Sequence, residues 1–411
     1  MKSKILVIGG GVVGVSIAHR LAQRTDPMKE PVTLLERDQI GGGPSGRFSA
    51  ILSTAGYSDD VALLAKESVR AYSRFEATSG RSLGFRRTGV LTLAGPDQKA
   101  EQAELRRNAE QLQGIGVSVE ILESNEIADR ASGVDVAAGT IGMWEPDCGV
   151  LDPTATIEGL ASLARSYGAI TRLGVEVKEL IIEDGRVRGV RTNEGDFTAD
   201  KVIIAAGPWS KKLLEPYGVD LSIRTRLSET VFFAMPGEES PTSDEVLDAS
   251  RETMSFDIEE DPFELTASTE IASGGHPAIV DLEYEFVCRG ESAMARAWVE
   301  RLPKATSEVK EFESAPTEVS TETRKWAHQV LAKRMPEYSE RDEIGVQTGV
   351  RAGTPDEAPL VGPVPGIEGL FVATAFDGCD YTLAPGVGEV VAQMVMGEHV
   401  TLCNPTKLAI R

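Results

Sequence analysis

The chain has few cysteines, no long apolar run and fewer basic than acidic residues. Its cysteines, Cys148, Cys288, Cys379 and Cys403, lack Cys-x-x-Cys spacing, which argues against a zinc site or a disulfide framework. No apolar stretch approaches the roughly 18 residues of a membrane-spanning helix, and no leader-like segment precedes the first apolar strand. We therefore expect a cytoplasmic protein without a metal site.

The charge is strongly acidic. The chain holds 42 lysines and arginines against 64 aspartates and glutamates, a formal net charge of −22. A surface of this sign disfavours nucleic acid and anionic membranes as partners. The 411 residues, 41% hydrophobic and 26% charged, have an ordinary globular composition and suffice for two or three domains.

The stretch 4–36 predicts a nucleotide-binding strand, glycine turn, helix and second strand. The apolar run at 5–8 predicts a buried parallel strand. Gly9, Gly11 and Gly14 then form Gly-x-Gly-x-x-Gly, in which the glycines permit the tight turn, the approach of a pyrophosphate and the packing of helix on strand.

The helix and second strand of this stretch complete the nucleotide site. The helix opens with Val12 and Val13, and free N–H groups at a helix start bind phosphate. The second strand ends at Glu36, followed by Arg37, and an acid at this position accepts the ribose hydroxyls of an adenosine. That acid argues against NADP and leaves NAD or FAD.

A glycine-rich loop follows at 41–47. Its Ser45, Gly46 and Arg47 offer a hydroxyl, a flexible backbone and a cation to a pyrophosphate. A flexible surface loop is the alternative interpretation.

Several segments together resemble the FAD-dependent amine and amino-acid oxidoreductases related to D-amino-acid oxidase, glycine oxidase and sarcosine oxidase. Besides the two glycine segments, they are Arg-Thr-Gly-Val-Leu at 87–91, Ala-Ala-Gly-Pro-Trp-Ser at 205–210, and the carboxyl-terminal elements at 349–362 and 383–388. The resemblance implies an α/β fold, α+β overall, in which a two-dinucleotide-binding, Rossmann-like FAD domain is joined to a discontinuous mixed-sheet substrate domain. It assigns residues 1–83, 146–220 and 336–411 to the FAD-binding domain and 84–145 and 221–335 to the substrate-binding domain.

The resemblance also implies FAD rather than NAD, because these added segments have a role only with the longer cofactor. The FAD is expected to be non-covalent, since Gly349 aligns with the cysteine that carries the flavin in sarcosine oxidases. The implied FAD-binding residues are Gly9, Gly11, Val12, Val13, Gly14, Glu36, Arg37, Ser45, Gly46, Arg47, Val175, Val177, Ala206, Gly207, Trp209, Arg351, Gly378, Asp380, Tyr381 and Thr382.

Arg351 is the first candidate for binding a substrate carboxylate. It lies where the glycine oxidase branch carries its carboxylate-binding arginine, and an arginine fork forms two parallel hydrogen bonds to a carboxylate. Arg289 and Tyr284, on a strand-like stretch at 278–289, are further candidates. His276 is predicted to be a loop residue, although it could act as a base. The other histidines are predicted to lie on helix surfaces: His19, His328 and His399.

Two substitutions depart from the family pattern near the flavin. Asp380 replaces a glycine and Thr382 replaces the common lysine. An aspartate there would repel a substrate carboxylate unless screened, or it would pair with a cationic substrate. A basic or N-alkylated amine therefore becomes a candidate substrate.

The resemblance predicts an FAD-dependent oxidase or dehydrogenase of an amino acid or secondary amine. The product imine would hydrolyse, and O2 or another acceptor would take the electrons. A 2-hydroxy acid or polyol dehydrogenase of the same fold is one alternative. Another is a flavin-binding subunit without turnover, suggested by the altered 378–382 segment and an acidic run at 237–264. An NAD-linked dehydrogenase leaves the carboxyl-terminal elements without a role. An oligomer or partner subunit stays open.

Periodicity predicts the remaining elements. Helices are expected at 59–78, 99–112, 153–167, 318–335 and 380–396, and strands at 139–144, 201–206 and 370–375. Residues 85–93 are expected to form paired strands around a turn, and the acidic run a solvated face or mobile loop.

Overall fold

The computed structural model describes residues 4–79, 82–236, 276–291, 294–303, 306–310 and 312–410, so the acidic run at 237–264 lies outside the described residues. The helices are α1 (Val12–Ala22), α2 (Asp59–Ser79), α3 (Lys99–Gly114), α4 (Ser124–Arg130), α5 (Pro153–Ser166), α6 (Ser210–Leu214), α8 (Thr321–Arg334) and α9 (Asp380–Met396). The strands are β1 (Ile5–Ile8), β2 (Val32–Leu35), β3 (Ile51–Leu52), β4 (Val90–Ala94), β5 (Glu120–Glu123), β6 (Ile141–Glu145), β7 (Gly149–Val150), β8 (Ile170–Arg172), β9 (Val177–Glu183), β10 (Arg186–Thr192), β11 (Gly195–Thr198), β12 (Lys201–Ile204), β13 (Arg224–Ala234), β14 (Ala278–Asp281), β15 (Phe286–Glu291), β16 (Arg296–Arg301), β17 (Glu343–Gly353), β18 (Leu360–Pro363) and β19 (Leu370–Thr374).

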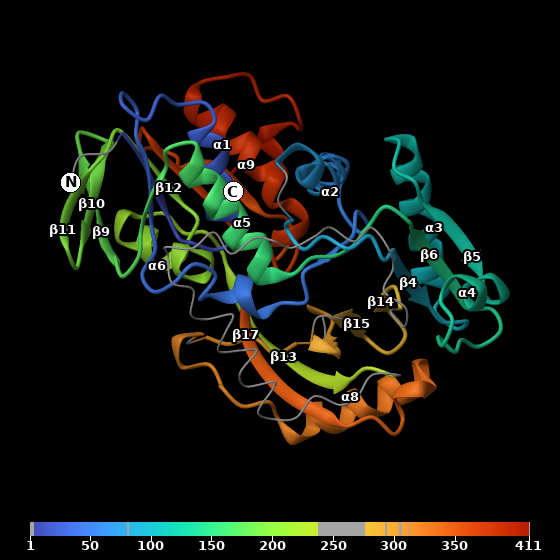
Figure 1. The fold of residues 1–411 in the computed structure, drawn as a ribbon. Helices are drawn as coiled ribbons and strands as arrows, with labels where there is room; N and C mark the ends of the chain where they lie inside the picture. Colours follow the sequence, from blue (N-terminus) through green and yellow to red (C-terminus); the bar gives the residue numbers. More distant parts are fainter. Residues whose placement is uncertain are drawn as a thin grey trace.

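A six-stranded sheet in the order β18-β19-β12-β1-β2-β8 forms one half of the molecule. Its central strand β1 pairs in parallel with β12 and β2. Ile5 and Val7 pack with helices α1, α5 and α9, whereas Leu6 and Ile8 pack with the small sheet β9–β11 (Figure 1). Burial on both faces explains the continuous apolar runs of these strands.

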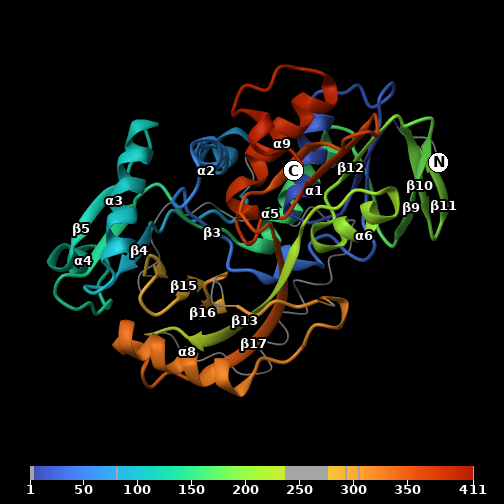
Figure 2. The ribbon, with the colours of Figure 1, turned by 180° about the vertical axis from the view of Figure 1, so that it is seen from behind.

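An eight-stranded, mostly antiparallel sheet in the order β17-β13-β16-β15-β14-β4-β6-β5 forms the other half. Helix α8 covers the outer face of this sheet below β13 and β17, as both views show (Figures 1 and 2). Val231, Phe233 and Cys288 pack against α8. Because side chains alternate along a strand, their neighbours point to the opposite face, toward the six-stranded half.

The predicted helices are confirmed, with ends that differ by up to three residues. Four other expectations are wrong. His399 follows the end of α9 and does not lie on a helix. Residues 85–93 form no hairpin, because β4 pairs with β6 and β14 instead. The stretch 278–289 is two antiparallel strands, β14 and β15, joined by a turn. His19 is only 7% exposed, and burial lowers its pKa to about 4.

The division into two domains remains a prediction. The two large sheets alternate along the chain in the manner that the predicted ranges suggest. However, β17 belongs to the eight-stranded sheet, although it lies in the range 336–411 that the sequence assigns to the FAD-binding domain. The long paired strands β13 and β17 thus lead from one half of the molecule to the other (Figure 1).

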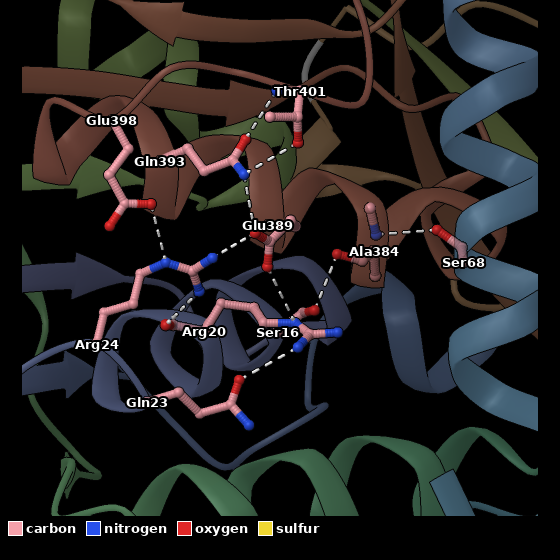
Figure 3. A network of polar contacts seen from close by, with 11 residues as sticks. Ser16, Arg20, Gln23, Arg24, Ser68, Ala384, Glu389, Gln393, Glu398 and Thr401 are labelled. Atoms are coloured by element: carbon pink, nitrogen blue, oxygen red, sulfur yellow. Dashed lines mark hydrogen bonds and ion pairs between the residues drawn. The ribbon is translucent and has the colours of Figure 1, made fainter. Parts of the chain in front are cut away.

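Polar contacts fix helix α9 against α1 (Figure 3). Ser16 on α1 donates a hydrogen bond to the carbonyl oxygen of Ala384 at 2.8 Å, and a Cβ on Gly388 would lie 2.9 Å from the backbone oxygen of Ser16. Arg24 binds Glu389 and lies 3.4 Å from Glu398. These contacts hold α9 alongside α1 over much of the length of both helices.

Candidate active site

The turn after β1 brings three backbone segments into close contact. Gly9 has φ +108°, and a Cβ there would lie 2.4 Å from the carbonyl oxygen of Ala205. A Cβ on Gly14 would lie 1.9 Å from the carbonyl oxygen of Gly9. Glycine is therefore required at both positions for helix α1 to pack against the turn.

The start of α1 lies against the glycine-rich loop 41–47. Its N-cap is Gly11, which has no side chain to cap the first N–H groups of the helix. The backbone N–H of Val12 donates to the Oγ of Ser45 at 3.2 Å, so the loop 41–47 lies directly over the helix start. Tyr381 holds that loop, since its hydroxyl donates to the backbone oxygen of Ser45 at 2.6 Å.

Glu36 joins the end of β2 to the glycine turn. Its Oε2 accepts a hydrogen bond from the backbone N–H of Gly10 at 2.6 Å, and its Oε1 accepts one from the backbone N–H of Asp38 at 2.8 Å. Next to it, the Arg37 guanidinium lies 4.8 Å from the centre of the Trp209 ring. The acid and the aromatic ring thus form one end of a continuous cavity.

This main cavity has a volume of about 400 Å³ and runs from Glu36 past the glycine turn to Arg351. Most of the residues predicted to bind the cofactor line it: Gly9, Gly11, Val13, Glu36, Arg37, Ser45, Val175, Val177, Ala206, Gly207, Trp209, Arg351, Gly378 and Asp380. The other six predicted residues do not line this cavity: Val12, Gly14, Gly46, Arg47, Tyr381 and Thr382. Val12, Gly14 and Tyr381 contact residues that do line it. Gly10, Phe48, Lys212 and Asp377 also line the cavity and were not predicted from the sequence.

Arg351 lies at the far end of the main cavity with all three of its nitrogens engaged. Its Nη2 binds Glu300, its Nε donates to Ser228 at 3.4 Å, and its Nη1 donates to the carbonyl oxygen of Asp377 at 3.5 Å. The guanidinium also lies 4.4 Å from the centre of the Phe48 ring. Burial works to lower the pKa of Arg351, but the carboxylate of Glu300 outweighs it and raises that pKa.

The turn before α9 is strained. Ala375 and Asp377 have positive φ angles of 64° and 47°, and a Cβ on Gly378 would lie 1.7 Å from Nη1 of Arg351. Arg226 holds Asp377 in place through a 2.6 Å ion pair. Such conformations persist only where the surroundings fix them, and they are common at functional sites.

One face of the eight-stranded sheet is polar and buried. The register places Ser228 opposite Gly349, Thr230 opposite both Glu300 and Gln347, and Trp298 opposite Arg289. Directly paired residues point to the same face, so this face differs from the one that α8 covers. Several of its polar atoms have no hydrogen-bond partner among the described residues: Nε and Nη2 of Arg289, Oε2 of Glu300 and Nε2 of Gln347.

Arg289 is 1% exposed, and its guanidinium packs 4.6 Å from the centre of the Trp298 ring. Its Nη1 donates to the carbonyl oxygen of Leu151 at 3.1 Å. Glu291 lies 3.7 Å from Nη2, close enough to offset the charge but too far for a hydrogen bond. Nε and Nη2, the two unpartnered nitrogens, are on one edge of the guanidinium and form a side-on fork.

The structure does not bring Tyr284 or His276 to the main cavity. Tyr284 lies in the turn between β14 and β15, and its ring is 4.7 Å from the guanidinium of Arg334 on α8. His276 contacts the Tyr338 hydroxyl at 3.1 Å on the same outer side of the sheet, and burial lowers its pKa. His276 is therefore not placed to act as the base.

Comparisons with known proteins agree with this geometry. The sequence profile of the FAD dependent oxidoreductases (DAO) matches residues 4–394. The chain belongs to this family. No helix in the described ranges is long and apolar enough to cross a membrane.

Relatives of the chain in this family have diverged widely. It is 24% identical to the glycine oxidase of Pseudomonas aeruginosa, over 97% of this chain and 96% of that protein. It is also 24% identical to the mitochondrial pyruvate dehydrogenase phosphatase regulatory subunit of mouse, over 96% of this chain but only 42% of that protein. The chain thus spans less than half the length of the first curated relatives it matches. The structure of the L-proline dehydrogenase from P. horikoshii aligns over 100% of this chain and 99% of the other, with a TM-score of 0.80 and 23% identity.

FAD fits the main cavity of this family member. The helix start at Val12 and the glycine turn suit its pyrophosphate, and Glu36 suits its adenosine ribose. Oδ1 of Asp377 and Oδ1 of Asp380 lack hydrogen-bond partners among the described residues, and both residues line the main cavity. Unpartnered buried polar atoms are rare in folded proteins, so this part of the main cavity is suited to receive a polar group.

Proposed function

We propose that the protein oxidises an amino acid or a secondary (N-alkyl) amine to an imine, which then hydrolyses. FAD, when bound, would supply the hydride acceptor, its N5 atom, for the substrate carbon that bears the nitrogen. The protein's own task is to hold the substrate with that carbon facing the flavin and to exclude water.

The main support for this proposal is that Nε and Nη2 of Arg289 have no hydrogen-bond partner among the described residues. A buried guanidinium with two unpartnered N–H groups on one edge is costly unless a ligand binds it. A carboxylate satisfies both N–H groups at once. Arg289 lies on the sheet face that carries the other unpartnered polar atoms, Oε2 of Glu300 and Nε2 of Gln347. We therefore assign substrate carboxylate binding to Arg289.

Arg351 receives a different role in this proposal. Its guanidinium is neutralised by Glu300 and its Nη1 reaches the backbone of the strained turn at Asp377. Three of its five N–H groups are engaged and Glu300 neutralises its charge, so Arg351 attracts a carboxylate less than a guanidinium whose side-on N–H groups are both unpartnered. Arg351 is therefore a positioning residue that shapes the end of the main cavity, and its assignment to the substrate remains a prediction.

We also propose that FAD is held without a covalent bond. Gly349 offers no side chain, and a Cβ there would lie 3.0 Å from the ring of Phe48. Cys379 lies in the chain between Gly378 and Asp380, which line the main cavity. Burial raises the pKa of its thiol. A neutral thiol is a poor nucleophile, so Cys379 is not suited to attack the flavin. The cytoplasmic location, the electron acceptor and a partner subunit remain predictions.

The proposal is tested by product analysis with a panel of amino acids and N-methyl amino acids. We expect a carbonyl product together with released ammonia or amine from at least one panel member. Oxidation of 2-hydroxy acids alone would favour the alternative dehydrogenase. FAD binding with no product from either class would favour a flavin-binding subunit, which the similarity to a regulatory subunit also suggests.

A further inference from the structure

Asp380 is an acidic residue close to the start of α1, where we place the pyrophosphate of FAD. It is the first residue of α9 and is 8% exposed. Its Oδ2 accepts a hydrogen bond from the Oγ of Ser45 at 3.2 Å, and the same Oγ accepts one from the N–H of Val12 at the start of α1. Its Oδ1 is buried and has no hydrogen-bond partner among the described residues, and the residue lines the main cavity. The hydroxyl of Ser45 thus links Asp380 to the N–H of Val12 at the start of α1.

The other charges near Asp380 are already paired. Arg351 binds Glu300, and Arg226 binds Asp377 at 2.6 Å. Within the described ranges, no lysine or arginine forms an ion pair with Asp380. Among these charges, Asp380 therefore has no direct ion-pair partner before any ligand binds, although the charge of Arg351 acts on it from a greater distance.

The remaining titratable groups around Asp380 do not supply a positive charge. They are Tyr72 from α2, and Cys379 and Tyr381 beside it in the chain, and burial raises the pKa of each. All three stay neutral at ordinary pH. Burial also raises the pKa of Asp380, against the opposing effects of Arg351, Ser45 and the backbone N–H groups at the start of α9.

We infer that Asp380 takes up a proton when FAD binds, so that FAD affinity depends on pH through this residue. A pyrophosphate next to an unpaired, buried carboxylate is repelled strongly, because like charges interact over short distances in a medium of low dielectric constant. Protonation removes the repulsion. It also gives the carboxyl group one O–H donor, which an ionised carboxylate lacks.

This inference rests on the FAD cavity of the proposed function and is independent of turnover. In this binding step, the apoprotein, FAD and one proton from solvent combine to give the holoprotein with a neutral Asp380. No redox change is involved. By linkage, FAD binds less tightly as pH rises through the interval between the apo and holo pKa values of Asp380, by about tenfold per pH unit.

The test counts protons. Apoprotein is titrated with FAD in a calorimeter at several pH values from about 5 to about 9, in buffers with different ionisation enthalpies, and the dependence of the measured enthalpy on buffer gives the protons taken up at each pH. We expect up to one proton per FAD for the wild type, with the largest uptake between the apo and holo pKa values of Asp380 and none well above or well below them. No proton uptake by a protein that binds FAD would overturn the inference.

Asp380→Asn and Asp377→Asn form a matched pair of variants. Asp380→Asn should bind FAD without proton uptake, at a pH-independent affinity at least that of the wild type at its acid limit. Asp377 lines the same cavity but has Arg226 as its partner, so Asp377→Asn should keep the proton uptake. Proton uptake that persists in Asp380→Asn would assign it to another group. Should that variant not fold, the wild-type count still decides. A protein that takes up no FAD at any pH contradicts the proposed function instead.

Discussion

Replacing Arg289 by alanine is expected to raise the substrate concentration for half-maximal flavin reduction by about 100-fold or more, with FAD retained. The truncation removes the unpartnered fork to which we assign the substrate carboxylate. Losing one partner of a buried, hydrogen-bonded charge pair costs about 2–5 kcal/mol, which includes the penalty of leaving the carboxylate unpaired. FAD should stay bound, because Arg289 is on β15 and does not line the main cavity.

Two controls separate this role from a structural one. Arg289→Lys keeps the charge and much of the packing against Trp298 but cannot form the fork, so most of the loss should remain. An amine substrate that lacks a carboxylate should lose little activity in Arg289→Ala, since it never used the fork. Equal losses for substrates with and without a carboxylate would show that Arg289 only supports the sheet.

Gly14→Ala is expected to abolish FAD retention or to weaken FAD binding by roughly 100-fold. The new Cβ would lie 1.9 Å from the carbonyl oxygen of Gly9, a contact with backbone that no rotamer relieves. The turn cannot move away, because Gly9 itself is packed against Ala205. Overpacking of this kind costs about 1–3 kcal/mol, and the displaced turn is the pyrophosphate site. FAD fluorescence quenching on titration of the apoprotein measures the effect.

Gly114→Ala is the matched control for this variant. Gly114 is the last residue of α3, and no atom lies within 4 Å of the position of its Cβ. Alanine there should leave FAD binding unchanged and stabilise the helix by up to about 1 kcal/mol. Wild-type FAD affinity in Gly14→Ala would contradict the account of the glycine turn.

The nucleotide end of the site could be predicted because it is local. Gly9, Gly11, Gly14 and Glu36 follow one another within a single strand-turn-helix-strand unit, so their spacing defines their positions. The helices were predictable for the same reason, since each shows its own period of apolar residues.

The substrate end could not be predicted, because it depends on contacts between distant residues. Arg351 and Glu300 are 51 positions apart and meet only through the register of β13, β16 and β17. Ser45 and Asp380 are 335 positions apart. A motif identifies an arginine but does not show whether another side chain already occupies its fork. The sequence therefore favoured Arg351, whereas the hydrogen bonds favour Arg289.

We propose that this protein passes a hydride from an amine to FAD. Anaerobic reduction of the bound flavin tests this proposal most directly. The oxidised holoprotein is mixed without oxygen with D-amino acids, L-amino acids and N-methyl amino acids in turn, and the absorbance of the oxidised flavin is followed. We predict that at least one carboxylate-bearing amine bleaches the flavin, and that Arg289→Ala needs about 100-fold more of it. A flavin that dithionite reduces but no amine does would contradict the account.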